Sequence, residues 1–145
     1  MKSRIILTAI WLLAFAFGVG IIESYLHIRD EQGIRILLAE DRIACMRPLL
    51  VLYGAYISGI LAFWYLRPFR PSPSDKVERV RFRLAIACTL AFNAPILYLV
   101  AQWHVTGGTT QGVLADVRTA VTWAALASFL VGPVNLYYFG MKPRS

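Results

Sequence analysis

Two apolar stretches of this sequence each carry an asparagine and a proline two positions apart. Asn93 and Pro95 interrupt one stretch, and Pro133 and Asn135 interrupt another. Proline has no amide hydrogen, so a helix through either stretch leaves one backbone carbonyl without its partner. In lipid such a carbonyl costs several kcal/mol unless another group satisfies it. We therefore predict an intramembrane polar site at these four residues.

The two asparagines lie at a similar distance from the basic residues that end their stretches. Asn93 is ten residues from Arg83, and Asn135 is seven from Lys142. At about 1.5 Å per residue, their depths differ by only about 4.5 Å. We expect the two amides to bond each other or the freed carbonyls, which would lock the helices together. A transport or quinone site between the two helices is the alternative.

Four further polar residues fall at the ends of apolar stretches and are candidates for an outer-rim site: Glu23, His27, Arg47 and His104. Glu23 and His27 have i,i+4 spacing and could share a metal with His104. Histidines at a membrane rim are more often amphipathic anchors, and no metal or nucleophile motif accompanies these. We predict neither a metal nor a cofactor and assign no catalytic residue, although an enzyme acting on a lipid or quinone remains an alternative.

The elements that must position these residues are four runs without a charged side chain, at residues 5–22, 49–66, 84–103 and 119–140. A membrane span needs about 20 apolar residues. Hydrophobic residues make up 58% of the chain and charged residues only 16%, below the quarter that is typical of soluble domains. We predict an all-α membrane protein, a four-transmembrane-helix bundle in a single domain over residues 1–145. A cleaved signal peptide is the alternative for the first run.

The distribution of Lys and Arg predicts how the bundle is oriented. Ten of these fifteen residues lie in the two termini and in the loop 67–83, and five lie on the other side. The positive-inside tendency then places both termini in the cytoplasm, and we expect a bacterial cytoplasmic (inner) membrane. A basic rim against anionic lipid accounts for the net charge of +7. We predict no nucleic-acid partner.

The connections have distinct compositions. The outer segment 23–47 has the pattern of an amphipathic helix over residues 30–45, lying on the membrane surface or capping the bundle. The basic loop 67–83 begins with three prolines in eight residues, which favours an extended connector. The third helix should begin near Asp75 and cross about two turns of cytoplasm before it enters lipid.

Small residues recur every fourth position in the last run, at Ala120, Ala124, Ser128 and Gly132. This spacing lets helices approach closely. We expect it to serve packing within the bundle, with a homodimer face as the alternative. The two cysteines, Cys45 and Cys88, should lie about 20 Å or more apart along the membrane normal, so we predict no disulfide between them.

These observations favour a protein that acts by binding another membrane component, as an accessory or assembly subunit or as a protective protein of the immunity type. The expected partners are membrane lipid and another membrane protein or a second copy of the chain. A small transporter or channel protomer with its site at Asn93 and Asn135 is the main alternative. The sequence leans away from an enzyme without excluding one.

Overall fold

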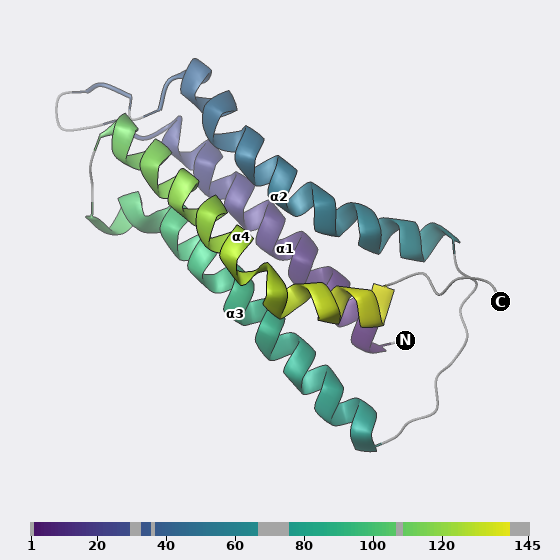
Figure 1. The fold of residues 1–145 in the computed structure, drawn as a ribbon. Helices are drawn as coiled ribbons and strands as arrows, with labels where there is room; N and C mark the ends of the chain where they lie inside the picture. Colours follow the sequence, from purple (N-terminus) through teal and green to yellow (C-terminus); the bar gives the residue numbers. More distant parts are fainter. Residues whose placement is uncertain (1, 30–32, 36, 67–75, 107–108, 140–145) are drawn as a thin grey trace.

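The computed structural model describes residues 2–29, 33–35, 37–66, 76–106 and 109–139. They form four helices, α1 (Lys2–Tyr25), α2 (Ala39–Leu66), α3 (Lys76–Thr106) and α4 (Thr110–Phe139) (Figure 1). The helices contain 24 to 31 residues, or about 36 to 46 Å, which exceeds the roughly 30 Å of a bilayer core. All four are long and apolar enough to cross a membrane, so the predicted all-α architecture of four such helices is confirmed, while their insertion in a membrane stays a prediction.

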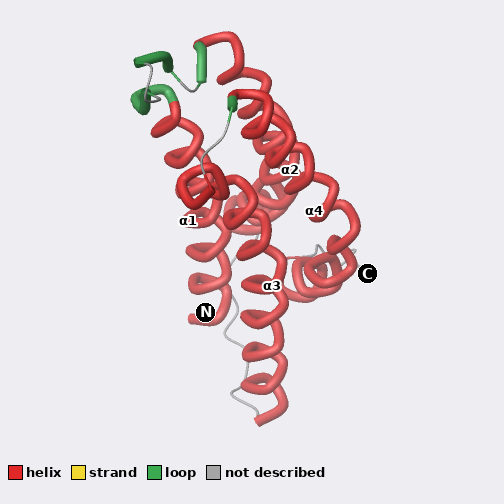
Figure 2. Tube along the Cα trace, turned by 90° about the vertical axis from the view of Figure 1, so that its left-hand side faces the viewer, coloured by secondary structure: helices red, strands yellow, loops and turns green. Residues whose placement is uncertain are grey.

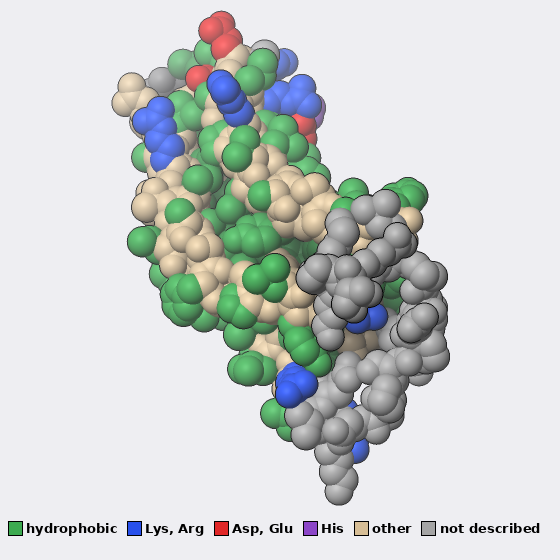
Figure 3. Space-filling model, turned by 45° about the vertical axis from the view of Figure 1, so that its right-hand side comes forward, with side chains coloured by type: hydrophobic (Ala, Val, Ile, Leu, Met, Phe, Trp, Pro, Cys, Tyr) green, Lys and Arg blue, Asp and Glu red, His purple; other side chains and the backbone are tan. Residues whose placement is uncertain are grey.

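The helices run alternately up and down the bundle. The starts of α1 and α3 and the ends of α2 and α4 therefore lie at the same end of the bundle, here called the basic end (Lys2, Lys76, Leu66 and Phe139). The α1–α2 and α3–α4 connections lie at the opposite end, here called the acidic end (Figure 1). Both α1 and α4 pack against α2 and α3. Figure 3 shows an apolar middle with Lys and Arg toward both ends, and acidic side chains visible only at the acidic end.

The first turns of α3 extend beyond the other helices at the basic end (Figures 1 and 2). The side chains of Arg79, Val80 and Arg83 are exposed there. The start at Lys76 agrees with the predicted start near Asp75. Asp75 itself and the proline-rich residues 67–74 lie outside the described residues.

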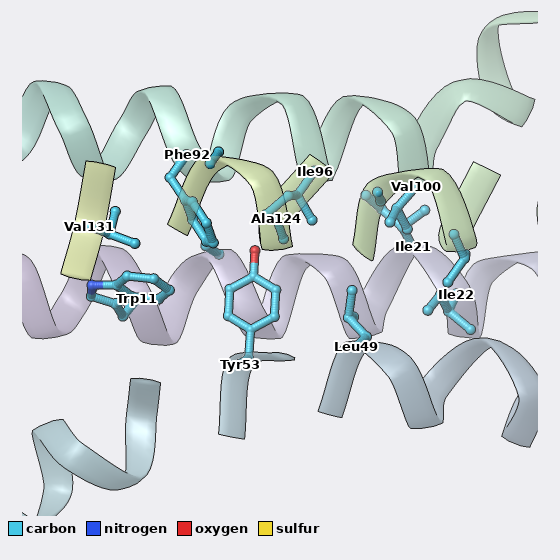
Figure 4. Close-up of a cluster of buried hydrophobic side chains, with 14 of the residues drawn as sticks. Trp11, Ile21, Ile22, Leu49, Tyr53, Phe92, Ile96, Val100, Ala124 and Val131 are labelled. Atoms are coloured by element: carbon cyan, nitrogen blue, oxygen red, sulfur yellow. The ribbon is translucent and has the colours of Figure 1, made fainter. Parts of the chain in front are cut away.

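Aromatic side chains from three helices form the centre of the core (Figure 4). Trp11 of α1 is fully buried, and its ring stacks on Tyr56 of α2 at 4.7 Å between centroids. It also contacts Tyr53 at 6.0 Å and Phe92 of α3 at 5.6 Å. Since α1 supplies such a central ring, it is an integral part of this bundle; its retention in the mature chain stays a prediction.

The amphipathic helix predicted over residues 30–45 is wrong for residues 33–35 and 37–38, which are not helical, while residues 30–32 and 36 lie outside the described residues. Gly33 has a φ of 78°, and Arg29 and Arg35 form an isolated antiparallel bridge. Helix begins only at Ala39, so the predicted helical residues from there on belong to α2. The physical reason is that glycine costs about 1 kcal/mol in a helix and supplies the left-handed conformation that a turn needs. Beyond Gly33, Leu37 is fully buried against the bundle, while Leu38 is exposed.

The small residues of α4 divide between two environments. Ala120 and Ala124 are fully buried, Gly132 is half-buried and Ser128 is exposed. Both cysteines are free, and Cys45 is buried while Cys88 is half-buried, so the predicted absence of a bridge between them is confirmed.

Candidate functional site

Asn93 of α3 is almost fully buried and holds two hydrogen bonds. Its Nδ2 donates to the carbonyl of Thr89 at 2.8 Å, and Tyr53 Oη of α2 donates to its Oδ1 at 2.8 Å. A carbonyl only accepts, so the amide nitrogen must face Thr89 and the amide oxygen must face Tyr53. One Nδ2 hydrogen is then left without an acceptor among the described residues, and Asn93 is one of the residues that line a groove between α1 and α3.

Asn135 of α4 has different surroundings. Its Oδ1 and Nδ2 are both buried and have no hydrogen-bond partner within the described part of the chain. The structure therefore does not join Asn93 and Asn135 directly, although both prolines lie inside continuous helices as the sequence requires. Pro95 is half-buried, Pro133 is exposed, and α4 changes direction toward its C-terminal end (Figure 1).

The four outer-rim candidates do not form one site, because each has different surroundings. Glu23 pairs with Arg42 of α2, whose Nε donates to Glu23 Oε1 at 2.9 Å. Arg47 is exposed and lines the clefts on either side of α2, and His27 is exposed. Over the ranges that the structure describes, no three His, Cys, Asp or Glu residues are grouped to hold a metal ion.

His104 of α3 is engaged with α1 instead. Its Nε2 lies 3.1 Å from Ser24 Oγ, and its ring stacks on Tyr25 at 4.7 Å between centroids. Ser24 Oγ also donates its one hydrogen to the carbonyl of Ile21 at 2.7 Å. Ser24 must then accept from His104, so the imidazole carries its hydrogen on Nε2. Tyr25 is fixed in turn, because its Oη donates to the carbonyl of Val100 at 2.6 Å.

A groove of about 910 Å³ lies between α1 and α3 and joins these polar groups. Its polar lining consists of Asn93 in the middle and the Ser24–His104 pair at the acidic end. The rest of the lining is apolar: Ile10, Leu13, Ala14, Ala16, Phe17, Gly20, Ile21, Leu90, Ala94 and Leu97. Since Asn93 and His104 are eleven residues apart on one helix, about 16 Å of groove separates the two polar positions.

This arrangement suits an amphiphile better than a soluble metabolite. The apolar lining can take a long chain, and the Ser24 hydroxyl oxygen, which has a second lone pair, can accept a hydrogen bond from a small head group at that end of the groove. Asn93 is the polar residue in the middle of this lining.

Several of these residues were not foreseen. Tyr53 could have been found, because a tyrosine hydroxyl in mid-span needs a hydrogen-bond partner. Ser24 gave no signal of its own, since its role depends on facing His104 from another helix.

In comparisons with known proteins, no protein-family model, no curated protein and no solved structure matches this chain.

Proposed function

We propose that this chain is a non-catalytic membrane protein that binds another membrane component, an amphiphile with a long apolar chain and a small hydrogen-bonding head. The observation that supports this most is the α1–α3 groove, which combines a volume of about 910 Å³ with a polar pair at one end. Small-molecule pockets have about 300–1,000 Å³, a mainly apolar lining and a few placed polar groups. An isoprenoid quinone and a single-chain lipid both have this shape.

The proposal includes a setting. We place the protein in a bacterial inner membrane with both termini in the cytoplasm, because ten of its fifteen Lys and Arg residues lie, by sequence, in the two termini and the loop 67–83. In this orientation, the end of the α1–α3 groove that contains Ser24 and His104 lies at the outer membrane surface. In this setting the protein acts as an accessory or protective subunit that holds the amphiphile, and it carries out no chemistry on it.

A transport site at Asn93 and Asn135 is supported less well. The Asn93 amide is held by Tyr53 and Thr89, and Asn135 forms no bond to it. A catalytic outer rim has similarly weak support, because Glu23 is paired with Arg42 while His104 is bonded to Ser24.

The test fills the groove without disturbing the bundle. Gly20 lines the groove, and a Cβ at this position would meet no atom within 4 Å. We expect Gly20→Leu to lower the amount of co-purified amphiphile by about fivefold or more, which corresponds to about 1 kcal/mol. The measurement is mass spectrometry of an organic extract of the protein purified in a mild detergent, expressed as amphiphile per chain.

Gly54→Leu is the matched control. Gly54 also has open space around a Cβ, but it lies on α2, away from the groove. The amount of amphiphile per chain that co-purifies with Gly54→Leu should equal the amount that co-purifies with the unmodified protein. Equal amounts in both variants, or no amphiphile in the unmodified protein, would count against the proposal.

A further inference from the structure

We propose a second, independent binding site at the basic end, for an anionic phospholipid whose acyl chain lies between α3 and α4. A groove of about 470 Å³ opens there. Away from the basic end its lining is apolar, with Leu84 and Cys88 from α3 and Leu130 and Val134 from α4. Leu84 is 62% exposed, so the groove is accessible from the surrounding lipid.

A positioned guanidinium group stands at the mouth of this groove. Arg81 of α3 lines the groove together with Tyr137 of α4. Arg81 Nη1 donates to Tyr137 Oη at 3.2 Å, and its Cζ lies 5.6 Å from the centre of the Tyr137 ring. These contacts hold the long side chain at the groove, so less conformational freedom is lost when an anion binds.

The net positive charge at this end of α3 favours an anionic head group over a zwitterionic one, although Arg81 is the only described basic residue that lines the groove. Arg79 and Arg83 are exposed on the same turns of α3. By sequence, the termini and loop that belong to this end contain ten Lys and Arg against two acidic residues, Asp75 and Glu78. Basic pockets between membrane helices on the cytoplasmic side bind anionic lipid head groups.

The occupant is a phospholipid, since the site joins a charge to an apolar groove. A free phosphate would use only the guanidinium and leave the apolar lining in contact with lipid. The site shares no lining residue with the α1–α3 groove, so either proposal can fail without the other.

The test titrates purified protein in detergent with phosphatidylglycerol or phosphatidylcholine of the same acyl chains and counts bound lipids by native mass spectrometry. A basic residue near a membrane surface changes affinity for anionic lipid about fivefold. We expect Arg81→Gln to lower phosphatidylglycerol affinity by about that factor and to leave phosphatidylcholine unaffected. Arg83→Gln is the matched control, because Arg83 is on the same helix but does not line the groove, and its effect should be less than half as large.

A second measurement uses the unmodified protein, so its result does not depend on how a variant folds. Cys88 lines the groove, whereas Cys45 is fully buried elsewhere and serves as an internal reference. Phosphatidylglycerol should slow the reaction of Cys88 with a maleimide severalfold more than phosphatidylcholine does. Equal effects of the two arginine substitutions, equal losses for both lipids, or equal protection of Cys88 by both lipids would overturn the proposal.

Discussion

Asn93 and Asn135 each lie two residues from a proline in a helix long enough to cross a membrane, yet their surroundings differ. Asn93 receives a hydrogen bond from Tyr53 of another helix and donates one within its own helix. Asn135 has buried polar atoms for which the described residues provide no partner. The same pair of residue types therefore stabilises the bundle at one place and costs stability at the other, because Tyr53 supplies a donor to Asn93 while the amide of Asn135 has no described partner.

The largest effect is expected for Asn93→Leu. This change leaves Tyr53 Oη buried without its acceptor, and a buried unsatisfied group costs about 1–3 kcal/mol. We expect the free energy of unfolding, measured by denaturant titration in detergent, to fall by about 1–2 kcal/mol. A loss below about 0.5 kcal/mol would show that this amide does not hold the bundle together.

Tyr53→Phe should have a smaller effect. It keeps the ring contact with Trp11 and removes only the donor to Asn93, so we expect a loss of about 1 kcal/mol. The double variant with Asn93→Leu should cost less than the two single changes together, because it removes both partners. In a double-mutant cycle, we expect a coupling of about 0.6–1.7 kcal/mol, and additive losses would contradict the hydrogen bond between the two side chains.

Asn135→Leu should have the smallest effect, with the opposite sign. Replacing an unpartnered buried amide by an apolar side chain of similar size is neutral or stabilising. We expect the unfolding free energy to stay the same or to rise by about 0.5 kcal/mol. A loss as large as that of Asn93→Leu would mean that Asn135 has a partner, and the contrast between the two asparagines would disappear.

The features that follow from local composition could be predicted from the sequence. The four runs without charge become helices, and the third helix starts at Lys76, beside the expected Asp75. The predicted outer helix over residues 30–45 was wrong at the described residues before Ala39. The pattern of Ile34, Leu37 and Leu38 fits a helix, but the chain turns at Gly33, and only Leu37 of the three is buried.

The candidate site was harder to predict, because its parts come from different helices. Asn93 was predicted as a polar group whose burial is unfavourable unless it is hydrogen-bonded. Its hydrogen bond with Tyr53, however, depends on how α2 is rotated against α3. His104 was foreseen as a rim residue, while its contact with Ser24 depends on the register of α1. The groove depends on side chains spread along two helices, and no single stretch of sequence contains that information.

The most direct test of the central claim is where a photoreactive fatty chain attaches to the protein in native membranes. The proposed function predicts covalent labels on the lining of the α1–α3 groove, at positions such as Phe17 and Leu97, and their loss in Gly20→Leu. Labels of equal intensity on outward side chains such as Leu61 of α2 and Leu126 of α4, which are also exposed, would contradict it.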